Sequence, residues 1–346
     1  MANEADSAFW AASKIPAALV DSLAGLFAPD SRFFPPYILA AIILACAAYY
    51  ANRKNLPPKY RAGFFRYLFT RDVYAHPSAF VDLKVTLANR LFTPLLVLAG
   101  RGAVIISAQA TALMILGSEA AESNAPIENI SLFALMSVTI AIVLASDFTT
   151  YWVHRLHHEH PVLWPFHKLH HSAETMTPLT FARKHPVYDL FRALSNAAIV
   201  GPVQGLIFAA FGIVDVAVIF GVNAAYALFH WLGSNLRHTH IWVSYGPIIN
   251  RVLISPAQHQ IHHSSAVTHH NKNYGEVFAF WDWMFGTLYV PEGYEQLEFG
   301  LADANGVKLN QPHATLKEAW TVPLKESGIA LRERGDTPAK ASPPAA

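Results

Sequence analysis

Long apolar runs alternate with polar segments along most of the chain. A helix that crosses a bilayer needs roughly 20 apolar residues, so runs of this length predict membrane-spanning helices. Arg101 stands in the middle of the second run, which predicts either a kinked helix or a helix followed by a re-entrant piece. The last two runs are nearly continuous around Gly212 and predict a tight helical hairpin. The runs fall at about 36–51, 87–116, 131–152, 194–212 and 213–231.

The segments around these runs divide the chain into three parts. Residues 1–35 are expected to form an N-terminal interfacial segment, and residues 36–323 a single membrane domain. Within that domain, 53–86 mixes aromatic with basic residues and is typical of an amphipathic element at the membrane surface. Residues 324–346 are polar and end in SPPAA, which predicts a disordered tail.

Composition supports a membrane protein. Of the 346 residues, 53% are hydrophobic and 14% are charged, and mean hydropathy is +0.26; soluble domains carry about 25% charged residues. The 25 basic residues are balanced by 24 acidic ones, so no nucleic-acid footprint is expected. The single cysteine, Cys46, excludes an intramolecular disulfide, a thiolate zinc site and a cysteine-ligated iron–sulfur cluster.

The distribution of basic residues predicts the orientation. Lysines and arginines follow the first and third runs, whereas the segment 117–130 carries three glutamates and no basic residue. The positive-inside rule therefore places 53–86, 153–193 and everything after residue 232 in the cytoplasm, and 117–130 on the opposite side.

Histidine is the most unusual feature of the composition. Of 18 histidines, 16 lie between His154 and His270, and the clusters among them fall on the predicted cytoplasmic side. Residues four apart share one face of a helix, and Ser255-Pro256 is a typical helix start just before the last cluster. The three clusters are His154 with His158, then His167 with His170 and His171, and finally His259 with His262 and His263.

Three such clusters offer about eight ring nitrogens, which is more than one metal ion can use. We therefore expect two metal ions side by side. Iron is favoured over zinc, because a catalytic zinc site needs only about three protein ligands.

These motifs resemble the fatty acid hydroxylase or sterol desaturase superfamily, the membrane-bound histidine-cluster di-iron oxygenases. The resemblance covers about 145–295. It rests on DFTTYWVHRLHHEHPVLWPFHKLHHS with ARKHP, and on SPAQHQIHHS followed by NKNYG and WDWMFGT. It implies an all-α, polytopic membrane helical bundle with a cytoplasmic helical cap that carries the di-metal site.

The resemblance also implies the ligands. The family's HxxxH corresponds to His154 and His158, and its two HxxHH motifs to the two later clusters. The family takes further ligands from the helix in between, where His230 fits best. Its partner is open, because Ser234 stands four residues on; His238 is preferred and His240 is the weaker choice.

Other polar residues are candidates to orient the ligands. Asp147 precedes His154 by two helical turns and could accept a ring N–H, or it could simply pair with a neighbouring arginine. His185, Asn273 and Tyr274 are the remaining candidates. We expect the side chains of His157, His160, His269 and His270 to lie away from the metal ions, and those of His76 and His313 at the surface.

The resemblance implies an oxygenase that uses O₂ as co-substrate and two iron ions (Fe²⁺/Fe³⁺) to hydroxylate or desaturate a C–H bond of a lipid. The chain shows no haem motif, no nucleotide-binding GxGxxG and no cysteine cluster. Electrons are therefore expected from a separate reductase, ferredoxin or cytochrome-type donor. The alanine-rich composition favours a bacterial cytoplasmic membrane.

Three other classes compete. A zinc protease would need HExxH, and a carboxylate di-iron bundle would need ExxH; neither motif is found. A histidine-rich metal-binding or transport protein would place its ligands along a path through the membrane. A bis-histidine haem carrier would need fewer histidines, on facing helices.

Overall fold

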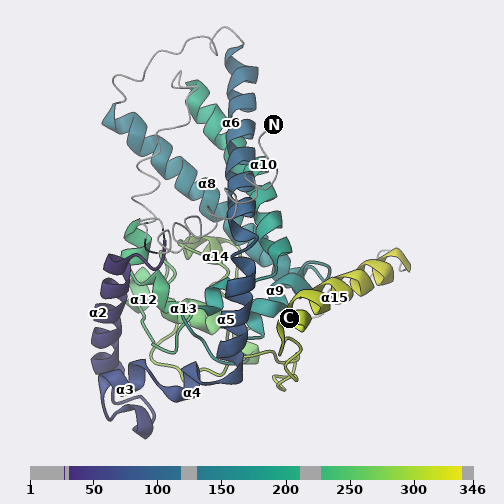
Figure 1. The fold of residues 1–346 in the computed structure, drawn as a ribbon. Coiled ribbons are helices and arrows are strands. Elements are labelled where there is room, and N and C mark those ends of the chain that lie inside the picture. The colour runs from purple at the N-terminus through teal and green to yellow at the C-terminus, as the bar shows by residue number, and fades with distance from the viewer. Residues whose placement is uncertain (1–26, 28–30, 118–130, 211–226, 337–346) are drawn as a thin grey trace, which may run out of the picture.

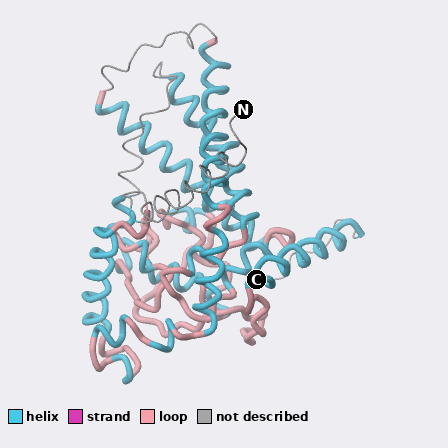
Figure 2. The backbone as a smooth tube through the Cα atoms, in the orientation of Figure 1, coloured by secondary structure: helices cyan, strands magenta, loops and turns pink. Residues whose placement is uncertain are grey.

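The computed structural model describes Phe27 and residues 31–117, 131–210 and 227–336. In these ranges every regular element is a helix, and only three isolated β-bridges join separate segments (Figure 2). The expected all-α fold is confirmed.

Three long helices form the upper part of the molecule in Figure 1: α6 (Thr93–Leu116), α8 (Leu132–Glu159) and α10 (Pro186–Ala210). Small residues let α10 pack closely along α6. A Cβ on Gly205 would lie 2.4 Å from the Ala108 carbonyl, and one on Gly201 would lie 2.6 Å from the Ser107 Cβ. Such close approach of small residues is typical of helix contacts in membranes.

Four described helices are long and apolar enough to cross a membrane. They are α2 (Pro35–Asn52), Leu95–Leu116 within α6, Met136–Glu159 within α8, and α10. The first four expected runs are thus helical. The second run is uninterrupted from Thr93 to Leu116 and is separated at residues 90–92 from the preceding helix. Most of the fifth run, and with it the expected hairpin, lies outside the described residues.

Short helices and loops fill the lower part, beneath the end of α8 (Figure 1). The helix α2 lies beside this part, where Tyr49 and Leu56 pack with Tyr67 and Ile241 in a buried cluster. The short α-helices are α3 (Phe64–Leu68), α4 (Arg71–Tyr74), α5 (Pro77–Asn89), α9 (Trp164–His171), α12 (Gly246–Ile249), α13 (Pro256–His262) and α14 (Phe280–Met284).

The C-terminal segment corrects one expectation. Residues 324–336, predicted to be disordered, belong to the helix α15 (Leu316–Asp336). Ala319 is fully buried against α5 and α9, and the Lys168 ammonium lies 2.9 Å from the Glu326 carboxylate. These contacts with distant segments stabilise a polar helix that its own composition does not predict. Residues 337–346 and nearly all of 1–30 lie outside the described residues.

Candidate metal centre

Two groups of buried histidines meet beneath α8. In each group the ligand nitrogens lie within 4.8 Å of one another. The first group is His154, His158, His167, His171 and His262, and the second is His170, His238, His259 and His263. All nine side chains are buried.

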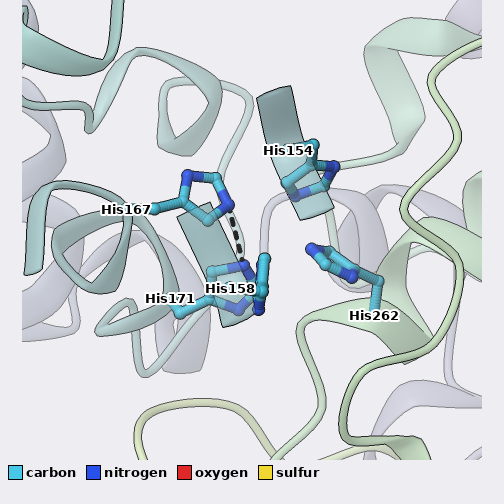
Figure 3. Close-up of side chains that lie close together, drawn as sticks. All are labelled: His154, His158, His167, His171 and His262. Atoms are coloured by element: carbon cyan, nitrogen blue, oxygen red, sulfur yellow. Dashed lines mark hydrogen bonds between the residues drawn. The ribbon is translucent and has the colours of Figure 1, made fainter. Parts of the chain in front are cut away.

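The first group gathers residues that share a helix face (Figure 3). His154 and His158 end α8, and His167 and His171 lie four apart on α9. The Nε2 atoms of His167 and His171 are 3.2 Å apart, which is the contact that the dashed line marks. His262 of α13 completes the group from the other side.

The second group adjoins the first and shares two of its helices. His170 of α9 lies between the two first-group positions of that helix. His259 of α13 and His263, the residue that caps the C-terminal end of α13, lie four apart on either side of His262. The His171 and His263 rings stack at 4.3 Å between centroids, so the groups are in direct contact.

The helix α13 begins as its sequence predicts. Ser255 is the N-cap and Pro256 the first helical residue. The Ser255 hydroxyl accepts the Gln258 N–H, and the Gln258 side chain accepts the Ser255 N–H at 3.0 Å. This capping box fixes the start of the helix. The buried capping box thereby also fixes the orientation of α13, and with it the directions in which His259, His262 and His263 point.

Backbone carbonyls set the tautomers of three ligands. His154 Nδ1 lies 2.8 Å from the Tyr274 carbonyl, His262 Nδ1 2.8 Å from the Lys272 carbonyl, and His170 Nδ1 3.1 Å from the Thr180 carbonyl. A carbonyl can only accept, so each Nδ1 carries the proton and donates it. Each Nε2 is then left with its lone pair, the form that binds a metal.

The inward nitrogens lack protein donors. The buried Nε2 atoms of His154, His158, His262 and His263 have no hydrogen-bond partner among the described residues. His238 Nε2 lies 3.1 Å from His170 Nε2 and 3.0 Å from His259 Nε2. Buried polar atoms are rarely left unsatisfied, and lone pairs at such distances repel one another. Cations at the two groups would satisfy these nitrogens, so the residues fit two metal ions.

Burial keeps seven histidines of the two groups neutral. It lowers the pKa of His167, His170, His171, His238, His259 and His262 well below the usual value, and neighbouring imidazoles lower it further. Burial likewise lowers the pKa of His263 to about 3. Neutral imidazole is the form that coordinates metals.

The loop NKNYG supplies two of the orienting carbonyls. Asn271 and Asn273 have φ of 58° and 57°, a left-handed conformation that asparagine tolerates better than most residues. The alternation turns the carbonyls of Lys272 and Tyr274 toward His262 and His154. The asparagine pattern therefore serves the ligands through backbone geometry.

This geometry predicts the effect of substitutions at Asn271. Asn271→Gly keeps a residue that accepts positive φ, whereas Asn271→Val opposes it by about 1–2 kcal/mol. We expect the valine variant to bind metal roughly 10–100-fold more weakly, which is typical when an outer partner of a ligand is lost, and the glycine variant to bind within a few-fold of the parent. Metal titration of both variants checks this, and equal affinities would contradict it.

A buried ion pair supports His170. Both side chains of Asp82 and Arg183 are fully buried, 3.1 Å apart. The other Asp82 oxygen accepts the hydroxyls of Thr180 (2.5 Å) and Thr177 (2.9 Å). Because the Thr180 carbonyl orients His170, the ion pair helps to position this candidate ligand through one intervening residue, Thr180.

Arg183 also closes the end of α9. Its guanidinium donates to the Leu169 carbonyl (3.0 Å), to the Ser172 hydroxyl (2.9 Å) and to Ser78. His313 Nδ1 lies 3.0 Å from the same Ser172 hydroxyl. His313 is fully buried, so its expected surface position is wrong; the reason is this contact with a residue 141 positions away. Sequence reasoning missed Asp82, Arg183 and Ser172.

The histidines at the end of the fifth run and just after it lie in different surroundings. His238 joins the second group. The ring of His230 lies outside both groups, with its Nδ1 2.6 Å from the Ser234 hydroxyl. His240 lies farther along, with Nε2 2.9 Å from the Tyr67 carbonyl. His157 donates to the Val153 carbonyl of its own helix.

The expected orienting residues occupy four distinct places. Asp147 accepts the backbone N–H groups of Val277 (2.9 Å) and Phe278 (3.0 Å), so it anchors the loop rather than a histidine ring. Tyr274 contacts His154 through its carbonyl. Asn273 bridges Gln258 and Tyr289 within the loop. His185 Nε2 lies 3.2 Å from the Trp320 carbonyl of α15. Elsewhere, His269 Nε2 lies 3.1 Å from the Glu295 carboxylate.

Comparison with known proteins identifies the matching segment. Residues 139–287 match the family model described as fatty acid hydroxylase. This range contains all nine grouped histidines. No solved structure matches the chain.

Curated relatives share part of the chain. The ornithine lipid hydroxylase OlsE of Rhizobium tropici is 28% identical over 207 residues, 57% of this chain and 56% of the relative. Alkylglycerol monooxygenase of Homo sapiens is 27% identical over 46% of this chain and 32% of its own length. The Delta(7)-sterol 5(6)-desaturase ERG3A of Gibberella zeae is 30% identical over 43% of this chain and 37% of its own length. The chain thus spans about half of the first relative and about a third of the others. Its histidine-bearing segment 139–287 therefore resembles the fatty acid hydroxylase family, and the relatives named above are similar to this same part of the chain.

Proposed function

We propose that the chain is a membrane di-iron oxygenase that hydroxylates or desaturates a C–H bond of a lipid, with O₂ as co-substrate and electrons from a separate donor. The single observation that carries this proposal is the pair of adjoining, buried imidazole groups beneath α8. The relatives support it, because their names describe a hydroxylase, a monooxygenase and a desaturase of lipids.

The ligand chemistry favours iron. Imidazole suits iron, zinc and copper, and five plus four nitrogens exceed what catalytic zinc needs. When bound, iron supplies the redox chemistry that activates O₂. The protein holds nine nitrogens in place, fixes three tautomers through carbonyls and excludes water by burial.

The membrane setting agrees with a lipid substrate. The long helices α6, α8 and α10 carry many exposed apolar side chains, including Leu98, Met114 and Ile140. The helices α9 and α13, which carry five of the nine grouped histidines, lie in the lower part of the molecule in Figure 1. The basic residues outside the helices favour a cytoplasmic position for these groups and for the described C-terminal helix. The proposed membrane is the bacterial cytoplasmic membrane, and the proposed electron donor is a reductase, a ferredoxin or a cytochrome.

Lipid mass spectrometry tests the activity. Membranes of cells that express the chain should contain one lipid class heavier by one oxygen, or lighter by two hydrogens, than the same class in cells without it. Purified protein should contain about two iron ions. A haem Soret band in place of non-haem iron would contradict the proposal.

Metal removal should destabilise the protein. Ligands that bind only the folded state stabilise it by mass action, and without cations the buried nitrogens lose their partners. We expect chelation to lower the thermal unfolding temperature and readdition of Fe²⁺ under anaerobic conditions to restore it. An unfolding temperature that chelation leaves unchanged, in protein shown to have lost its metal, would count against a bound di-metal centre.

A further inference from the structure

An apolar cavity lies against α8, the helix that also carries His154 and His158. Its volume is about 160 Å³, and its apolar lining comes from Val143 of α8, from Leu228, Phe229 and Leu232, and from residues 253–254 and 277–278. Among the described residues of its wall, Asp147 is the one carboxylate; its oxygens accept three N–H groups, including that of the Trp281 indole at 3.1 Å. The cavity therefore offers an apolar chamber whose acidic group is already engaged.

Arg237 marks one end of this cavity. Its guanidinium stacks on the Phe229 ring at 4.5 Å and donates to the Ile254 carbonyl at 2.9 Å, and both residues line the cavity. Arg237 is buried, and the next residue, His238, belongs to the second histidine group. A buried positive charge thus contacts the wall of the cavity, on a residue that directly precedes a member of the second histidine group.

Glu276 lies among several cations at the same end. Although burial alone would raise the pKa of this carboxyl, the charges of Arg192, Arg32, Arg237 and Lys184 hold it below its usual value. The Arg32 guanidinium comes within 3.8 Å of the Glu276 carboxylate, longer than the about 2.7–2.9 Å of a charge-assisted hydrogen bond. The residues after Glu276, Val277 and Phe278, line the cavity.

Positive charge exceeds negative charge here. Among the described residues, Asp189 and the Asp147 of the cavity wall are further carboxylates near this end. Asp189 pairs with Lys184 at 3.0 Å and with Arg192 at 3.9 Å. The four cations therefore face three carboxylates. Side chains of Arg32, Lys184 and Arg192 are 25%, 23% and 40% exposed, so a ligand can reach them.

We propose that the apolar cavity and the cations around Glu276 form one amphipathic slot, which binds the lipid substrate by an anionic head group, a carboxylate or a phosphate, with an alkyl chain in the cavity. This inference rests on the proposed function only in calling the bound lipid a substrate. The binding of the lipid is argued from the slot itself. Its charged end includes Arg237, which directly precedes His238 in the chain, and Glu276, which follows Tyr274 by two residues; the Tyr274 carbonyl orients His154. The slot therefore turns the head-group end of the lipid, rather than the far end of its chain, toward the histidine groups.

Three amphiphiles with the same lauryl chain test the slot. The metal-loaded protein, in nanodiscs of neutral phosphatidylcholine, is titrated anaerobically with laurate, lauryl phosphate and lauryltrimethylammonium, and affinity is read from the shift in unfolding temperature. We expect the anionic probes to bind and the cationic probe to bind at least about tenfold more weakly, since charge-assisted hydrogen bonds contribute about 1.5–3 kcal/mol. Whichever anionic probe binds more tightly assigns the head group as a carboxylate or a phosphate.

Variants separate charge from chain. Arg32→Gln and Arg192→Gln should each weaken anionic binding by about tenfold, whereas Arg53→Gln, an exposed arginine beyond α2, should not change it. Leu253→Trp, which fills the cavity, should weaken both anionic probes while metal content stays the same. Equal binding of the cationic probe, or unchanged affinity in both arginine variants with native metal content, would overturn the proposal. Because no electron donor is present, these outcomes do not depend on whether the protein oxidises lipids.

Discussion

Replacing one histidine of either group with alanine is expected to remove about one of two metal ions and to abolish lipid oxidation. His158→Ala deletes a ligand of the first group and His259→Ala one of the second. Each leaves the other group's nitrogens in place. Loss of an outer partner typically costs 10–100-fold, so loss of a ligand itself should lower turnover by at least about a hundredfold. Metal analysis and lipid mass spectrometry on the same membranes measure both effects.

A third alanine variant gives this test its control. His230 was expected from the family resemblance to be a ligand, yet its ring lies outside both groups and contacts Ser234. His230→Ala should therefore retain the metal content of the parent. Loss of one ion in this variant would return His230 to the ligand set, and full metal in the His158 and His259 variants would refute the two groups as metal sites.

Breaking the buried pair of Asp82 and Arg183 is expected to have the second largest effect. Removal of one partner of a buried ion pair leaves the other charge unpaired and costs about 3–5 kcal/mol. Asp82→Asn or Arg183→Met should therefore lower the free energy of unfolding by about 3 kcal/mol or more. The double variant Asp82→Leu with Arg183→Met should regain part of it, because it leaves no lone buried charge. Denaturant unfolding in detergent measures these differences.

A surface pair and a metal readout complete the experiment. Lys59 and Asp72 form an ion pair with side chains 60% and 54% exposed, and Lys59→Gln should cost less than about 1 kcal/mol. If the Asp82 network also positions His170, folded Asp82→Asn should bind one metal ion more weakly than the other. Equal weakening of both ions, or none, would reduce the network to a purely stabilising role.

The sequence predicted best what depends on local spacing. Apolar runs of sufficient length gave helices α2, α6, α8 and α10, and the four-residue spacing of His154 with His158 and of His167 with His171 placed each pair in one group. The capping signal at Ser255 likewise marked the start of α13. Each of these features depends only on the local geometry of a helix, which the spacing of residues in a single sequence is enough to predict.

Spacing could not predict the course of the chain between elements. Gly233 has φ of 94°, which ends the helical path after His230 and brings His238 to the centre by a new route. The helical spacing of Asp147 and His154 suggested a direct contact between their side chains. In the structure, the loop that carries Tyr274 contacts both residues instead: its N–H groups at Val277 and Phe278 donate to Asp147, and its Tyr274 carbonyl accepts from His154. The burial of His313 and the order of residues 324–336 depend on contacts across more than 100 positions. No periodicity records such contacts.

The helices α9 and α13 each contribute nitrogens to both groups, and this sharing constrains the centre mechanically. On α9, the neighbouring residues His170 and His171 belong to different groups and differ by a single residue step, about 1.5 Å of rise. On α13, His259 and His262 belong to different groups and are three residues apart. The spacing between the two groups is therefore set by secondary structure: strain in the surrounding loops can tilt an individual ring, but moving the groups apart requires unwinding a helix.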